Sequence, residues 1–212
     1  MELLLDPITI NSRKVLAGFK LIGAEYSIKK IDFFKAEYAT PEYLEMNPMA
    51  SVPTLRDGDF TLWESNAILQ YAADKVGNNS AYPTDLKIRA DINRWLLWES
   101  NNWFASCYVF VVENCVKPLL EDKTDQNILA NEEPNFHKLA SILDARLKEN
   151  TFLCGEEPTI ADVAIAAPMH MHEYFKLPLT DHPNLVRWMT ENIEKCSWWM
   201  ETRVEEGFTL PE

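Results

Sequence analysis

Several features are scarce or missing in this chain of 212 residues, and each absence excludes a class of protein. No apolar run approaches the roughly 20 residues that a membrane-spanning helix needs, so we expect no membrane protein. The apolar residues 3–5 follow no basic region, so no secretory signal is expected. Positive charge is also scarce, because 20 Lys and Arg stand against 33 Asp and Glu, and the formal net charge is −13. This balance repels phosphates and anionic lipids, so neither nucleic acid nor a membrane is an expected partner.

Cysteine is scarce as well, and no Cys-x-x-Cys pair occurs among Cys107, Cys115, Cys154 and Cys196. Such isolated cysteines are typical of buried thiols in a reducing compartment, so we predict a cytoplasmic protein without disulfides. We also expect no metal. His170 and His172 lie two positions apart on a predicted helix, so their side chains point to different sides and do not chelate one ion.

The order of apolar and polar residues divides the chain into two zones. Residues 1–78 alternate strand-like and helix-like segments, whereas residues 85–212 form one helical pattern after another. Residues 79–84 lie in a polar stretch bounded by Gly77 and Pro83, which is typical of a linker. We therefore predict an α+β domain with the order βαβ-α-ββα, a short linker and an all-α domain.

The first zone is predicted to contain a strand at 2–5, a helix at 12–24, a strand at 26–33, a helical turn at 41–44, a hairpin around residues 57–58 and a helix at 65–76. In the second zone, helices are predicted at 85–116, 135–148, 159–174 and 184–204. Thr159 and Asp162 have the spacing of a helix N-cap and the acidic residue that completes a capping box. The apolar residues that follow predict a buried central helix.

The segment 47–65 carries the most specific pattern. Pro53 follows Val52 at the start of a short apolar run, where a proline fits only at the first residue or the edge of a strand. Asp57-Gly58 is typical of a hairpin turn, and Glu64-Ser65 precedes apolar residues at helical spacing. Ser65 is therefore a candidate N-cap.

This order of Val-Pro, hairpin, Glu-Ser and helix resembles the glutathione-binding domain of the cytosolic glutathione transferases, whose first domain is thioredoxin-like. The segment that begins at Thr159 is similar to the capping box in the helical domain of the same family. The two resemblances lie in the expected order and together cover essentially the whole chain. They imply a thioredoxin-like α+β domain, an all-α domain that contributes a second-substrate pocket, and glutathione as co-substrate.

The resemblance implies a glutathione site in the first zone. Glu64 and Ser65 match the family pair that holds the γ-glutamyl end, where a hydroxyl and a helix N-terminus face a carboxylate. Val52 matches the position whose backbone pairs with the cysteinyl residue, and the family proline that matches Pro53 is cis. The alternatives are a simple N-cap for Ser65 and an ordinary trans proline for Pro53.

The thiol of glutathione needs a hydrogen-bond donor that stabilises its thiolate. The family places this donor in the loop after the first strand, as Tyr in some classes and as Ser or Cys in others, and the loop here contains no tyrosine. Thr9 stands at the usual serine of theta-like classes, and Thr9 with Asn11 resembles the Thr-x-Asn element of the bacterial Nu class. We predict Thr9 as principal donor, Asn11 as second donor and Ser12 as a further candidate. The alternative is that Asn11 or Ser12 only caps the helix.

One part of the expected site departs from the family pattern. Relatives often hold the glycyl carboxylate with a His and with a Lys or Gln, where this chain has Tyr38 and Ser51. A hydroxyl can hydrogen-bond a carboxylate but brings no positive charge, and Lys35 is a nearby candidate to supply it. The affinity for glutathione therefore stays open.

Aromatic residues are dense on the long predicted helix at 85–116. Trp103, Phe104 and Tyr108 are candidates for the wall of an apolar pocket that takes a hydrophobic electrophile. The alternative is that they belong to the core, because aromatic residues at helical spacing are more often buried.

Together these features imply a homodimeric glutathione transferase, a detoxification enzyme that activates the glutathione thiolate for attack on a hydrophobic electrophile or a disulfide. A Nu-like loop favours the second reaction, disulfide reductase activity, which passes through a mixed disulfide; peroxidase activity is a further option. The alternative is a binding or regulatory module of the same fold without turnover.

Overall fold

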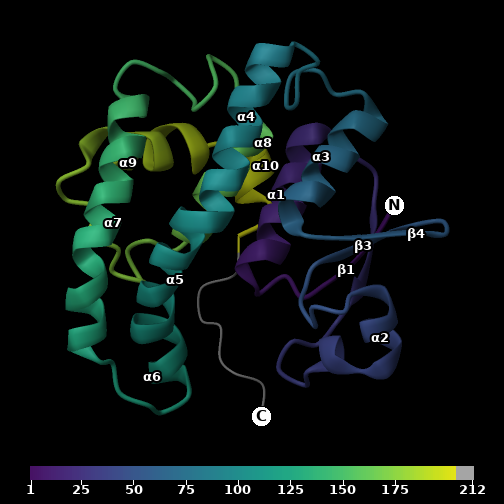
Figure 1. Ribbon diagram of the computed structural model, residues 1–212, viewed down its shortest axis with the longest axis horizontal. Coiled ribbons are helices and arrows are strands. Elements are labelled where there is room, and N and C mark those ends of the chain that lie inside the picture. Colours follow the sequence, from purple (N-terminus) through teal and green to yellow (C-terminus); the bar gives the residue numbers. More distant parts are fainter. Residues whose placement is uncertain (204–212) are drawn as a thin grey trace. The chain divides into compact units, whose positions relative to one another are not determined.

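The computed structural model describes residues 1–203, which form two compact units (Figure 1). Among the described residues, unit 1 comprises 1–84 and 197–203, and unit 2 comprises 85–196. The predicted linker ends at the boundary between these units. The predicted helical domain included residues 197–212, whereas the described part of that segment, 197–203, belongs to unit 1.

Unit 1 contains a four-stranded mixed sheet with the strand order β2-β1-β3-β4. β1 (Glu2–Leu5) pairs in parallel with β2 (Ser27–Lys30) and antiparallel with β3 (Thr54–Asp57). A hairpin connects β3 to β4 (Phe60–Trp63), and Gly58 adopts the left-handed φ of 64° that its turn needs. The thioredoxin-like class predicted for this part of the chain is confirmed.

Helices cover both faces of this sheet. α1 (Ile10–Ile22) and α3 (Ser65–Val76) pack against each other on one face, whereas α2 (Pro41–Met46), preceded by a 3-10 turn at Glu37–Ala39, lies on the other (Figure 1). Because successive side chains of a strand point to opposite faces, β1 serves both layers. Leu4 packs with Tyr43 of α2, while its neighbours Leu3 and Leu5 are also fully buried.

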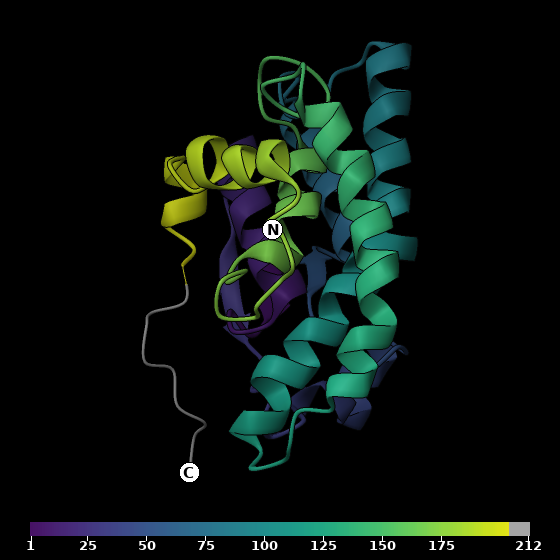
Figure 2. The same ribbon diagram turned by 90° about the vertical axis from the view of Figure 1, so that its left-hand side faces the viewer.

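Unit 2 is helical, and its first half is one long helical run. The run begins with α4 (Leu86–Trp98) and continues through a π-helical segment, Glu99–Trp103, into α5 (Phe104–Val111). A second π-helical segment, Val112–Val116, leads into α6 (Lys117–Leu119). α7 (Gln126–Leu147) packs against α5, as Figure 2 shows from the side. The predicted long helix is therefore present, with two π-helical segments that the apolar pattern did not indicate.

The second half of unit 2 surrounds a buried helix, α8 (Ile160–Ala166), which ends in a 3-10 turn at Ala167–Met169. α9 (Pro183–Arg187) continues as a π-helical segment, Trp188–Ile193. The predicted helix at 184–204 is interrupted there, and α10 (Ser197–Met200) belongs to unit 1; residue 204 lies outside the described residues.

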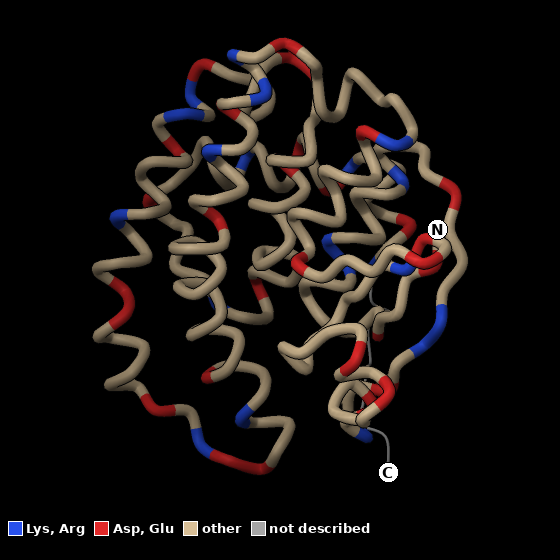
Figure 3. Tube along the Cα trace, turned by 45° about the vertical axis from the view of Figure 1, so that its right-hand side comes forward, with Lys and Arg blue, Asp and Glu red and all other residues tan. Residues whose placement is uncertain are grey.

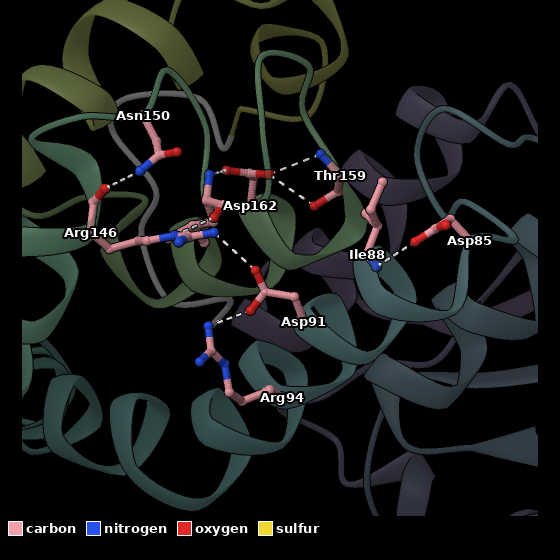
Figure 4. A network of polar contacts seen from close by, with 9 residues as sticks. Asp85, Ile88, Asp91, Arg94, Arg146, Asn150, Thr159 and Asp162 are labelled. Carbon is pink, nitrogen blue, oxygen red and sulfur yellow. Dashed lines mark hydrogen bonds and ion pairs between the residues drawn. The ribbon is translucent and has the colours of Figure 1, made fainter.

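The capping box that the sequence predicted begins α8 (Figure 4). Thr159 Oγ1 accepts a hydrogen bond from the N–H of Ala161 at 3.3 Å, and the carboxylate of Asp162 accepts one from the N–H of Thr159 at 2.9 Å. Asp162 is completely buried and also accepts from the N–H of Leu153 and from Trp188 Nε1. One carboxylate thus joins the start of α8 to two neighbouring segments.

Acidic residues are spread over both units, in keeping with the net charge of −13 (Figure 3). Within residues 1–203, no helix is both long enough and apolar enough to cross a lipid bilayer.

Candidate functional site

The loop after β1 carries the hydroxyl that we predicted as principal thiolate donor. Thr9 precedes α1 as its N-cap residue, yet its side chain makes no capping hydrogen bond. Thr9 Oγ1 instead donates toward Ser12 Oγ at 2.7 Å, and it lies 3.2 Å from the carbonyl oxygen of Asp6. Ser12 is completely buried, whereas Thr9 is partly exposed. Of the two hydroxyls, that of Thr9 is the one a ligand can reach.

The side chain of Asn11 contacts a different element. Ser65 Oγ donates a hydrogen bond to Asn11 Oδ1 over 3.4 Å, which joins the first turn of α1 to the first residue of α3. The interpretation of Ser65 as an N-cap is wrong, because Glu64 occupies the cap position and Ser65 begins the helix. The structure therefore brings Asn11 and Ser65 together at the N-terminal ends of two helices.

Glu64 has an unusual backbone conformation. Its φ of 73° lies in the left-handed region, which a residue with a Cβ adopts only at a cost of about 1–3 kcal/mol. The residue is exposed, and its side chain does not cap α3. This conformation turns the chain from the end of β4 directly into α3, so that Ser65 faces Asn11.

The peptide bond between Val52 and Pro53 is cis, as predicted. Within residues 1–203, no protein group hydrogen-bonds to the backbone N–H or C=O of Val52. The turn before it is held by two residues that the sequence reasoning missed, Tyr43 and Asn47. The Tyr43 hydroxyl and Asn47 Nδ2 each donate to the carbonyl oxygen of Ser51 at 2.8 Å. Asn47 is the first residue of the segment 47–65, but nothing in the sequence pattern indicated that its side chain is fully buried.

The three residues expected near the glycyl carboxylate lie in different environments. Ser51 is exposed, and Tyr38 packs against the cluster of Leu4, Tyr43 and Val52, so its ring supports the core under α2. Lys35 Nζ lies 3.1 Å from a carboxylate oxygen of Asp32. The hydrogen bonds that Asp32 accepts from the backbone and ammonium of Lys35 lower the pKa of this carboxyl, so part of the Lys35 charge is already engaged.

An apolar pocket of about 380 Å³ lies within unit 2, between α5 and the first turn of α7. The rings of Phe104 and Tyr108 are stacked on its wall, with centroids 5.5 Å apart and planes 15° from parallel. The remaining lining residues are Ala105, Val109, Val112, Glu113 and Ile128.

Trp103 does not line this pocket. Its side chain is completely buried, and its Nε1 donates to the carbonyl oxygen of Ile165 at 3.1 Å. Its indole stacks near Trp98 and Phe136, inside the core of unit 2. Trp103 and Phe104 are adjacent in the sequence. The spacing of the aromatic residues alone did not show which of the two is buried in the core and which lines the pocket.

The comparisons with known proteins agree with this architecture. The family model for the glutathione S-transferase N-terminal domain matches residues 4–74, and the model for the C-terminal domain matches residues 109–195. A probable glutathione S-transferase of Oryza sativa subsp. japonica is 30% identical over 205 residues, which cover 93% of each chain. The chain belongs to the glutathione S-transferase family. A second relative, glutathione S-transferase D7 of Drosophila melanogaster, is 30% identical and covers 94% of this chain and 86% of its own.

Two solved glutathione S-transferase structures are similar over nearly the whole chain. One is glutathione S-transferase I bound with lactoylglutathione, with a TM-score of 0.86 and 25% identity over 95% of this chain and 97% of its own. The other is glutathione S-transferase I from maize in complex with an atrazine glutathione conjugate, with a TM-score of 0.84 and 26% identity over 95% of each chain. The fold predicted from the sequence is thus shared by glutathione S-transferases that bind glutathione derivatives.

Within residues 1–203, no cluster of three or more His, Cys, Asp or Glu side chains is placed to hold a metal ion. All four cysteines are free thiols. Burial raises the pKa of the Cys107 thiol well above its ordinary value and that of Cys154 to about 12, so these two are poor nucleophiles.

Proposed function

We propose that this chain is a glutathione transferase that forms the glutathione thiolate and directs it to a hydrophobic electrophile. The observation that carries the proposal is the meeting of Asn11 and Ser65 at the N-terminal ends of α1 and α3, next to the accessible hydroxyl of Thr9. The positive ends of two helix dipoles favour an anion at this place. Glutathione brings both anions that the site needs, a carboxylate and a thiolate.

In the proposed complex each part of glutathione has its own partner. The γ-glutamyl carboxylate binds Ser65 and the N–H groups that begin α3, while Glu64 faces the ammonium group. The cysteinyl backbone pairs with the N–H and C=O of Val52, which no other protein group occupies within residues 1–203. The glycyl carboxylate lies toward Ser51, Tyr38 and Lys35, whose single positive charge is shared with Asp32.

The chemistry consists of ionising a thiol and positioning it. A free thiol has a pKa of about 8.5, so a donor to the sulfur raises the fraction of thiolate at neutral pH. We assign this role to Thr9, which makes the site one of the Ser/Thr type. The thiolate sulfur then forms a bond to the electrophilic carbon, whose leaving group departs with the electron pair.

We place the second substrate in the pocket lined by Phe104 and Tyr108. Its volume of about 380 Å³ suits a small organic molecule, and the stacked aromatic rings favour a flat apolar one. Attack on a disulfide instead of a carbon remains the second reaction of the same thiolate, because Thr9 and Asn11 match the Thr-x-Asn element of the bacterial Nu class.

The test measures the pKa of bound glutathione by the ultraviolet absorbance of its thiolate. The wild-type protein is expected to lower this pKa by about one unit or more, and Thr9→Ala to reverse most of the change, because the donor is lost. Thr9→Ser keeps the hydroxyl and serves as the matched control. Absence of glutathione binding at millimolar concentration would refute the enzyme; a lowered pKa that survives Thr9→Ala would move the donor role to Asn11 or Ser12.

A binding module without turnover is the second candidate. It is favoured by one observation, the lack of a basic side chain at Tyr38 and Ser51. Turnover of a model aryl halide and of a model disulfide distinguishes the two: a module binds glutathione but converts neither substrate, and the ratio of the two rates shows which reaction an enzyme prefers.

We further propose that the protein is a cytoplasmic homodimer. The four free thiols support a reducing compartment. A dimer is supported by exposed apolar side chains on unit 2. Leu97 is 65% exposed, and Ile142, which is 43% exposed, lines a cavity of about 410 Å³ together with Trp95, Trp98, Arg94 and Arg146. Sedimentation of the wild type and of Leu97→Glu tests this, because a charge on an interface converts a dimer into monomers.

A further inference from the structure

α1 and α3 approach each other unusually closely along one seam. A Cβ added to Gly18 would lie 2.2 Å from Cδ2 of Leu69, so only glycine allows the two helix axes to come this near. Gly18 lies one helical turn from Lys14, and Lys14 lies three residues from Asn11, so all three share one face of α1. This face meets the first turns of α3 in the same order: Asn11 contacts Ser65, Lys14 contacts Asn66, and Gly18 contacts Leu69.

Lys14 is the charged member of this seam. The residue is 2% exposed, and its Nζ donates to Asn66 Oδ1 at 3.4 Å. Asn66 directly follows Ser65, so the ammonium group lies beneath the second residue of α3. The neighbouring cation, Arg13, is turned elsewhere, with its guanidinium carbon 4.4 Å from the centre of the Trp199 ring. The side chain of Lys14 thus reaches the first turn of α3 from within the packed interior of unit 1.

We propose that Lys14 is a positioning residue for glutathione: its buried ammonium, placed under Asn66, attracts the γ-glutamyl carboxylate to Ser65 and so sets the affinity for the tripeptide. This role rests on the proposed function, since it presupposes that the carboxylate binds at the start of α3. Lys14 does not touch the ligand; it acts through its charge and through the position of Asn66.

The physical basis is the weak screening of a buried charge. A positive charge near the protein surface acts on an anion several ångströms away through a dielectric much lower than that of water, whereas an exposed lysine is screened by solvent and salt. The partial positive charge at the N-terminus of α3 adds to the same potential. Lys14 therefore favours a carboxylate at this place more than a surface lysine does.

The rest of the proposed glutathione site offers little positive charge, so the charge of Lys14 contributes a larger share of the attraction. The glycyl end has Tyr38 and Ser51 where relatives often carry a basic or amide group, and the charge of Lys35 is shared with Asp32. Electrostatic recognition of the tripeptide is therefore shifted from its glycyl end to its γ-glutamyl end.

The experiment compares two ligands on two proteins by calorimetry. One ligand is glutathione, and the other is the analogue in which 4-aminobutanoate replaces the γ-glutamyl residue and thereby removes its α-carboxylate. Lys14→Met keeps the length and apolar stem of the side chain but removes the charge. We expect Lys14→Met to raise the Kd of glutathione about tenfold and the Kd of the analogue less than twofold. Lys14→Arg restores the charge and is expected to recover part of the lost affinity.

The possible outcomes separate the two proposals. If the wild-type protein binds no glutathione, the proposed function fails before Lys14 is tested. If the wild type binds glutathione but Lys14→Met weakens both ligands equally, or neither, Lys14 has only a structural role and the inference is overturned. Lys20→Met is the matched control, because Lys20 lies in the last turn of the same helix, far from the start of α3, and it is expected to leave both affinities unchanged.

A buried position can also fail to tolerate substitution. Lys14→Gln, which keeps a hydrogen-bond donor for Asn66, replaces Lys14→Met if the latter loses its helical circular dichroism. If neither variant folds, Asn66→Ala at the partly exposed end of the contact takes their place. A loss of at least threefold for glutathione alone supports the role of the pair, and an equal loss for both ligands refutes it.

Discussion

Two side chains at the start of α1, those of Thr9 and Asn11, make contacts that differ in kind. The hydroxyl of Thr9 bonds within its own helix to Ser12, whereas the amide oxygen of Asn11 accepts from Ser65 on α3. The Thr-x-Asn pattern suggested two donors to one sulfur atom. The geometry instead favours a division, in which Thr9 acts on the thiol and Asn11 holds the residue that receives the γ-glutamyl carboxylate.

This division predicts separate effects of substitution. Asn11→Ala is expected to raise the Kd of glutathione about tenfold, because Ser65 loses the acceptor that orients its hydroxyl, a hydrogen bond worth about 1 kcal/mol or more. The pKa of the bound thiol is expected to stay within about 0.3 of the wild-type value. Calorimetry and thiolate absorbance measure the two quantities on the same samples. A marked rise in the thiol pKa would return Asn11 to the role of a donor.

In unit 2, the buried carboxylate of Asp162 accepts several hydrogen bonds at once. Its carboxylate accepts hydrogen bonds from the backbone N–H and hydroxyl of Thr159 (Figure 4), from the N–H of Leu153 and from the Trp188 indole, so all four partners are donors. Complete burial outweighs these hydrogen bonds and raises the pKa of the carboxyl to about 6. The folded chain therefore keeps a proton on Asp162 that the unfolded chain releases at about pH 4.

The raised pKa gives a pH dependence with a definite sign. Between about pH 4 and 6 the folded state binds more protons at Asp162 than the unfolded state, so the contribution of this group to stability falls as the pH rises and is constant above that range. Asp162→Asn has no such slope, and it is less stable because its NH2 group faces donors. We expect the stability difference between the two proteins to narrow by up to about 3 kcal/mol from pH 4 to pH 7. Urea unfolding at several pH values measures it; a difference that widens would show that the carboxylate is stabilised by folding.

At the scale of elements, sequence patterns succeeded where a short-range signal carries the information. The Asp57-Gly58 hairpin, the helix that begins at Ser65 and the capping box at Thr159 all depend on residues within a few positions of each other. The pattern failed for α7, which begins at Gln126, nine residues before the predicted start at 135. Pro134 lies inside the helix, and the N-cap is Asp125, whose side chain accepts a hydrogen bond from the N–H of Asn127 at 2.9 Å.

The contrast between short-range signals and long-range contacts also applies to the candidate site. Thr9, Val52 and Ser65 became candidate site residues because a local motif surrounds each of them. The burial of Trp103 and of Lys14 was not predicted, because whether a side chain is buried depends on segments far away in sequence. The indole of Trp103 bonds to Ile165, and the ammonium of Lys14 to Asn66, at separations of 62 and 52 residues. No single window of the sequence contains that information.

The seam between α1 and α3 predicts the effect of one methyl group. Gly18→Ala places a Cβ against Leu69, which is completely buried and has little room to move. We expect a loss of about 1–3 kcal/mol in the free energy of unfolding, although alanine is intrinsically the better helix former. Thermal or urea denaturation measures the loss. In a Leu69→Ala background the added methyl group loses its nearest clashing atoms, so there the same substitution should be neutral or stabilising. An equal loss in both backgrounds would contradict the close approach.

At the scale of the whole molecule, the chain does not simply pass from one unit to the next. It leaves unit 1 at residue 84, builds unit 2, and returns to unit 1 at residue 197. The sequence predicted the first boundary from the polar linker and the change in periodicity. It did not predict the return, because α10 is a short helical pattern like its neighbours and no local feature indicates which unit it packs against.

The return of the chain makes a residue near the C-terminal end part of the support for α1. Trp199 is 1% exposed, the guanidinium of Arg13 lies over its ring, and Glu201 pairs with Lys20 on the same helix. Trp199→Ala is therefore expected to cost about 3–5 kcal/mol, through the lost packing and cation–π contact.

The amides that lose protection in Trp199→Ala distinguish this topology from a chain in which residues 197–203 belong to the helical domain. Hydrogen exchange in Trp199→Ala should accelerate at the amides of α1 and β1, because α1 loses the helix that covers it, while the amides of α7 and α8 keep their wild-type rates. Trp198→Ala, at a partly exposed neighbour, is the matched control and should change little. Since the proposed glutathione site begins at Thr9, the first residue before α1, the affinity for glutathione should fall along with the protection of α1. If exchange accelerated only in the helices of unit 2, residues 197–203 would belong to the helical domain, as the sequence alone had suggested.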